Sequence, residues 1–107
     1  MSEEPDRDWK LKLRYGKTTT PYQHFTVIAE GVIEEANDIN GGSEGPAFMR
    51  MSAWASSGDE ATDMIEVIAP ELGFHATGRI YVYKTEPGQP PRDKPFGYGI
   101  GFTPYEK

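Results

Sequence analysis

The side chains of this sequence that are best suited to chemistry are two histidines, an arginine and a tryptophan. His24 and His75 are its only imidazoles, and a metal site would need both of them plus a carboxylate at coordination distance. Their spacing gives no such pattern, so we expect each histidine to be a surface or half-buried residue. If the chain has a ligand pocket, we expect His24, Arg50, Trp54 and His75 to line it.

Several reaction classes are excluded by composition. The chain contains no cysteine, which removes disulfides, thiolate metal sites and thiol nucleophiles. It also lacks the Gly-x-Ser-x-Gly turn of serine hydrolases, and Ser57 is explained better as a helix cap. We therefore predict no catalytic residue, no metal and no cofactor, and leave open whether the chain is an enzyme.

Three other motifs favour structural interpretations. Lys10, Lys12 and Arg14 form a cationic row, which is typical of an exposed strand face paired with carboxylates. Residues 37–41 resemble a calcium loop, but with Gly41 at the sixth position the first and last ligands would be alanines. Residues 87–92 match the short proline pattern read by SH3 domains, and a rigid connection between strands explains them more simply.

Periodicity predicts the elements that must position these residues. Alternating apolar residues predict strands over 9–15, 25–33, 48–55, 77–83 and 98–102. In 48–55 the methionine face is expected to be buried, and 98–102 is expected to have one bulky and one bare face. Ser57 and Glu60 form a capping box that begins a helix with an apolar stripe ending at Leu72, followed by Gly73. Pro70 should kink or loosen the last turn.

The connections also have distinct compositions. Glycine and asparagine in 34–46 predict a mobile loop, whereas the prolines of 86–95 predict a stiff one. We expect residues 1–8 to be a flexible arm and residues 9–107 to be a single α+β domain. Its sheet should be largely antiparallel and about five-stranded, in the order β-β-β-α-β-β, with one helix packed on one face.

Charge and hydropathy limit the partners. The formal net charge is -6 and the pI is about 4.8, so the field of the protein repels nucleic acid and anionic membrane surfaces. No apolar run approaches the ~20 residues of a membrane helix. The acidic, polar first residues differ from a secretion signal. We expect a cytoplasmic protein that binds neither nucleic acid nor membrane.

Three stretches resemble short bacterial proteins of unknown function. They are residues 24–31 (HFTVIAEG), residues 46–57 (PAFMRMSAWASS) and residues 102–105 (FTPY). The resemblance spans much of the chain and implies a self-contained bacterial domain. It brings no catalytic residue, cofactor or partner.

Two functional hypotheses follow. The first is a non-catalytic binding or protein-interaction module, because no nucleophile, base and orienting group come together in the pattern. The second is a small-molecule-binding domain or small enzyme with a pocket near His24, His75, Arg50 and Trp54. One helix is too narrow to cover all strand aromatics, so some must lie on the opposite face. A homodimer would cover them, as would curling of the sheet or the proline loop.

Overall fold

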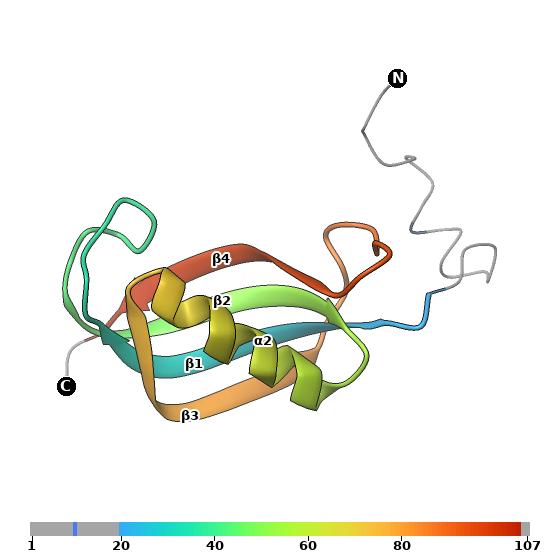
Figure 1. Ribbon diagram of the computed structural model, residues 1–107, viewed down its shortest axis with the longest axis horizontal. Helices are drawn as coiled ribbons and strands as arrows, with labels where there is room; N and C mark the ends of the chain where they lie inside the picture. The colour runs from blue at the N-terminus through green and yellow to red at the C-terminus, as the bar shows by residue number, and fades with distance from the viewer. Residues whose placement is uncertain (1–9, 11–19, 106–107) are drawn as a thin grey trace, which may run out of the picture.

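The computed structural model describes residue 10 and residues 20–105. Residues 20–105 form an α+β fold with one helix and four strands (Figure 1). The strands are β1 (Gln23–Ile33), β2 (Gly45–Ala55), β3 (Phe74–Lys84) and β4 (Phe96–Pro104), and the helix is α2 (Gly58–Glu71). The predicted arm 1–8 and the other residues of the predicted strand 9–15 lie outside the described residues. Lys10, the one described residue of that predicted strand, is helical, so the strand prediction is wrong at this position.

The four strands form one antiparallel sheet in the order β3-β1-β2-β4. The α+β class, the antiparallel sheet and the single covering helix are therefore confirmed. The described order is β-β-α-β-β, so the expected count of about five strands is not met within residues 20–105. Each strand is longer than predicted, because periodicity marks the buried centre of a strand better than its ends. The described helix is neither long nor apolar enough to cross a membrane.

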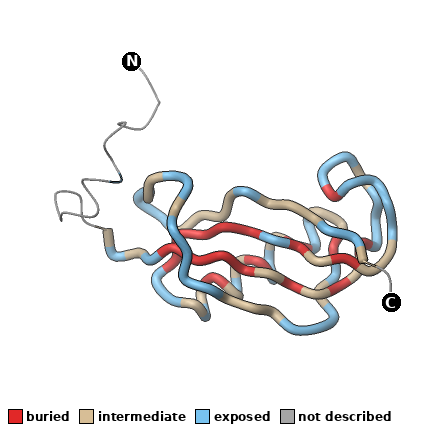
Figure 2. Tube along the Cα trace, turned by 180° about the vertical axis from the view of Figure 1, so that it is seen from behind, coloured by how far each residue is buried: buried red, intermediate tan, exposed pale blue. Residues whose placement is uncertain are grey.

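The core lies between α2 and one face of the sheet, here called the inner face. Alternate residues of the two central strands point to it, which confirms the methionine face of β2 as the buried one. Figure 2 shows this burial concentrated along the central strands. The core comprises Phe25, Val27, Ala29 and Ile33 of β1, Ala47, Met49, Met51, Ala53 and Ala55 of β2, Ala61, Ile65 and Ala69 of α2, and Phe74 of β3.

Both ends of α2 are fixed as the sequence predicts. The Ser57 hydroxyl accepts from the backbone N–H of Glu60 at 3.1 Å, and the Glu60 carboxylate accepts from the N–H of Ser56 at 2.8 Å. Gly73 has a φ of 78° after the helix, a conformation that glycine adopts without a Cβ clash. Near Pro70, the N–H groups of Leu72 and Gly73 donate to the carbonyls three residues earlier in the chain, instead of the carbonyls four residues earlier as in a regular α-helix. The last turn is thus tightened rather than loosened, which differs from the prediction for Pro70.

Part of the loop 34–44 is held against the end of α2 through Asn37 and Asn40, which the prediction of a mobile loop did not anticipate. The Asn40 side chain is fully buried, and its amide donates to the carbonyls of Glu35 at 2.7 Å and Leu72 at 2.9 Å. Its oxygen accepts from the N–H of Asn37 at 2.9 Å. The loop thereby satisfies a carbonyl that the helix end leaves unpaired.

Strand β4 departs from the predicted single bulky face. The register with β2 shifts between Arg50 and Ser52, next to Gly99, whose φ is 61°. A bulge of this kind re-aims the side chains beyond it. Phe102 pairs with Met49 on the inner face, whereas Tyr98 pairs with Ser52 on the opposite face. That opposite face, here called the open face, holds the candidate site.

Candidate functional site

The open face is built by the residues that alternate with the core. Strand β1 contributes His24, Thr26, Ile28 and Glu30, and β2 contributes Phe48, Arg50, Ser52 and Trp54. Strand β3 adds Tyr81 and Tyr83, and β4 adds Phe96 and Tyr98. No helix crosses these strands when the described chain is seen from behind (Figure 2). The expectation that some strand aromatics lie away from the helix is therefore confirmed.

One end of the open face is covered by the proline-rich connection between β3 and β4. His24 and Trp54 are directly opposite each other in the register and are only 7% and 4% exposed. Their rings meet edge to face, with centroids 5.2 Å apart. The indole N–H of Trp54 donates to the carbonyl of Gln89 at 2.8 Å. The stiff loop thus closes over these two predicted site residues.

The Tyr98 hydroxyl joins this loop to His24. It accepts from the N–H groups of Gly88 at 2.8 Å and Gln89 at 3.3 Å. Because a hydroxyl has two acceptor lone pairs and one proton, its proton is left for the Nε2 atom of His24, 2.6 Å away. Nε2 is then an acceptor and Nδ1 carries the ring proton.

That proton also has a partner. The His24 Nδ1 atom lies 3.1 Å from both the carbonyl and the hydroxyl of Thr85, and the Thr85 hydroxyl lies 2.9 Å from that of Thr26. Burial lowers the pKa of His24 below 6.5, opposed by its bond to the Thr85 backbone and by the nearby Glu86 carboxylate. The imidazole is therefore held neutral, with both nitrogens engaged in structural bonds.

Sequence reasoning missed Tyr98 and Thr85 as members of this cluster. Tyr98 was expected to share a face with Phe102, and the bulge at Gly99 reverses that. Thr85 lies just after β3, where its carbonyl accepts from His24. The sequence signal for Tyr98 is the three alternating glycines of the last strand, Gly97, Gly99 and Gly101, because a strand glycine can mark a bulge. No sequence signal points to Thr85.

No described helix covers the remaining open face, and at its far end the Tyr105 ring packs against Phe48, with ring centroids 4.6 Å apart. Here we define the open-face patch as Ile28, Glu30, Phe48, Arg50, Tyr81 and Tyr83. Tyr83 is 51% exposed and Arg50 is exposed, while the other four residues are half-buried. The Glu30 carboxylate accepts from the Tyr81 hydroxyl at 3.0 Å, which is the main cause of the raised pKa of Tyr81. No hydrogen bond or ion pair of Arg50 is found within the described residues.

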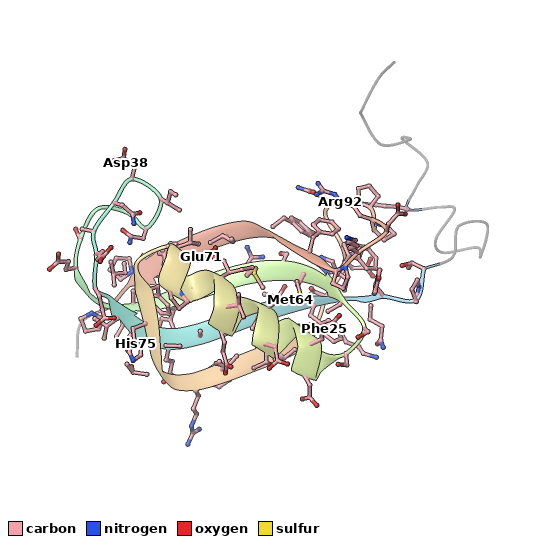
Figure 3. All side chains as sticks on the ribbon, in the orientation of Figure 1. Phe25, Asp38, Met64, Glu71, His75 and Arg92 are labelled. Carbon is pink, nitrogen blue, oxygen red and sulfur yellow. The ribbon has the colours of Figure 1, made fainter. Side chains whose placement is uncertain are left out.

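The four predicted site residues are therefore not all brought together. His24 and Trp54 are in contact. Arg50 lies on the same face of β2, four residues before Trp54. His75 pairs with Val32 of β1, which is eight residues from His24 on the same strand. At about 3.3 Å per residue, His75 and His24 are therefore about 26 Å apart along the sheet. Figure 3 shows His75 and Arg92, a residue of the proline loop, at opposite ends of the sheet. The prediction that His75 shares a pocket with His24 is wrong.

A separate hollow lies between α2 and the beginning of β4. Its volume is about 480 Å³, and none of the four predicted site residues lines it. The walls are mostly apolar, and Glu60 and Asp63 contribute carboxylates from the helix. The lining consists of Glu60, Asp63, Met64, Val67, Ile68, Pro95, Phe96 and Gly97.

Neither a metal-binding cluster nor an unengaged imidazole at position 24 is found among the described side chains. Across residue 10 and residues 20–105, no three His, Asp or Glu side chains are grouped so as to hold a metal ion. The His24 imidazole already accepts from Tyr98 and donates to Thr85, so it is not a free base. What remains is an apolar and aromatic surface with single charges.

Comparisons with protein-family models, with curated proteins and with solved structures found no match.

Proposed function

We propose that this domain is a non-catalytic interaction module and that the open-face patch is its contact surface. The observation that carries the proposal is the half-exposed Tyr83 with Tyr81 and Ile28 next to it, on a sheet face that no described helix covers. Aromatic side chains with a polar end are enriched where proteins meet. A flat sheet face suits a protein surface better than a small ligand, which prefers a concave site.

The covered end of the same face supports this interpretation. His24, Trp54 and Tyr98 use their polar atoms to hold the proline loop. Their bonds make this end a rigid support for the neighbouring patch, and rigid surfaces lose less conformational entropy on binding.

The hollow between α2 and β4 favours the alternative, a small-molecule-binding domain or small enzyme. Its volume of about 480 Å³ falls within the usual range of ligand pockets. A ligand there would be largely apolar, with a cationic group toward Glu60 and Asp63. The site differs from the predicted pocket at His24, His75, Arg50 and Trp54, and those residues would not touch such a ligand.

Photo-crosslinking in the producing cells tests the interaction function. We would replace Tyr83 with a photoreactive phenylalanine analogue, and make the same change at Glu66, an exposed residue of α2, as the matched control. We expect a protein adduct from position 83 well above the level from position 66. Equal adduct levels from the two positions would contradict the proposal.

Two further features are proposed from sequence alone. The chain is proposed to be a bacterial protein, and the cytoplasm is proposed as its location. Cell fractionation would test the location.

A further inference from the structure

We propose that the partner of the open-face patch is a second copy of this chain, related by a two-fold axis that places Arg50 of each copy against Glu30 of the other. The inference rests on the proposed interaction function and names its partner. It follows from the position of the two charges and from the distribution of charge over the molecule, and the size of the face limits its strength.

The two charges lie on a diagonal of the patch. Arg50 is directly opposite Ile28, and Glu30 is directly opposite Phe48. Such diagonal positions on neighbouring strands are about 7–8 Å apart. Arg50 makes no hydrogen bond or ion pair among the described residues. Glu30 has one described bond, from Tyr81 to its Oε1 atom, so its carboxylate retains acceptor capacity.

This diagonal is self-complementary under a two-fold rotation. When two sheets stack face to face, the axis lies in the plane between them. An axis perpendicular to the line from Glu30 to Arg50 exchanges the two positions, so each arginine meets a carboxylate. An axis along that line would instead set like charges together, which is unfavourable.

The distribution of charge favours a second copy over a strongly charged partner. The formal net charge is -6, but many of the carboxylates lie in the loop 34–44 and on α2 rather than on the open face. The patch as defined holds one cation and one anion among apolar and aromatic side chains, and Arg79 lies at its edge, next to the Tyr81 side chain. A strongly acidic partner would place negative charge against Glu30, and a strongly basic partner would place positive charge against Arg50.

The size of the face limits the dimer to a weak one. At about 4.8 Å per strand the sheet is about 19 Å wide, and six positions along a strand extend about 20 Å. Two such faces cover about 800 Å² before side-chain relief is counted, which is below the roughly 1,000 Å² that most specific interfaces exceed. We therefore expect a dimer that dissociates in the micromolar range or above.

Charge exchange tests the arrangement. We would measure mass by sedimentation from about 1 μM to 1 mM for the wild-type chain, for Arg50→Glu, for Glu30→Arg and for an equal mixture of the variants. The wild-type mass should rise from 11.9 kDa toward twice that value. Each single variant should dissociate at least about tenfold more readily, because like charges then meet twice. The mixture should recover wild-type association to within about threefold.

A second measurement uses only the wild-type chain. Methyl signals of Ile28 should shift on dilution, whereas those of the exposed Ile39 and Val67, which lie outside the patch, should not. A constant mass near 11.9 kDa overturns the dimer, and an unrescued mixture overturns the charge pairing. If the chain is monomeric but crosslinks from position 83 to another protein, the interaction function stands and this inference fails. If no crosslink forms either, both fail.

Discussion

Tyr98 is the residue whose hydroxyl forms the most hydrogen bonds at the covered end of the open face. One oxygen binds two backbone N–H groups of the proline loop and the imidazole of His24. Such shared bonds act as a unit, so the loss of one atom releases several partners at once. The consequences are testable with substitutions that change little else.

Tyr98→Phe should lower the free energy of unfolding by about 1–3 kcal/mol, because Nε2 of His24 and two loop amides lose their shared partner. Denaturant titration would measure the loss. Tyr83→Phe is the matched control: that ring is 51% exposed, and the change should stay within about 0.5 kcal/mol. Equal effects for both variants would mean that the network adds nothing to stability.

The buried His24 predicts a dependence of stability on pH. Burial lowers its pKa in the folded state, so the unfolded chain binds more protons below pH 6.5. The stabilising contribution of neutral His24 is fully present above pH 6.5. It is lost as the pH falls below 6.5 toward the pKa of His24 in the folded state.

Urea titrations between pH 5 and 8 would show this slope. His24→Gln retains a hydrogen-bonding side chain without a titrating ring, and should flatten the dependence between pH 5 and 6.5. If wild type and variant lose stability in parallel over that range, His24 is not responsible.

At the scale of elements, the loop 34–44 serves as the cap of the helix end. Asn40→Ala should cost about 1–3 kcal/mol, since it removes a fully buried amide bonded to the carbonyls of Glu35 and Leu72. Asp38→Ala in the same loop is the control, because Asp38 is exposed (Figure 3). A thermal midpoint for Asn40→Ala equal to that of the control would show that the loop does not support α2.

The elements also show what sequence reasoning can reach. The capping box at Ser57, Gly73 after the helix and the methionine face of β2 are set by local pattern, and all three were predicted. The contact of His24 with Trp54 depends on strand register. The direction of Tyr98 depends on a bulge. Neither is encoded in any short stretch of residues. The sequence therefore identified His24 and Trp54 by residue type without their contact, and it missed Tyr98.

The same limit explains the other two misjudged features. His75 was grouped with His24 by residue type, yet strand pairing places them at opposite ends of the sheet. The loop 34–44 was considered mobile because of its glycines and asparagines. Those asparagines form hydrogen bonds to a helix end that is distant in sequence.

At the scale of the whole molecule, stability should not require a metal. The sequence has no cysteine, and the described residues hold no group of three ligands. Thermal unfolding with and without a chelator should therefore give the same midpoint. A decrease of more than a few degrees on chelation would reveal a site that this fold does not suggest.

The strand order β3-β1-β2-β4 has a consequence for how the chain folds. Strands β1 and β2 are neighbours in sequence and form the centre of the sheet, so their pairing closes only the loop 34–44. Strands β3 and β4 each pair with one member of this hairpin and not with each other. Short loops close at the lowest entropic cost. We therefore expect the protein to fold from the middle of its sheet outward, with the central hairpin as the template on which both outer strands assemble.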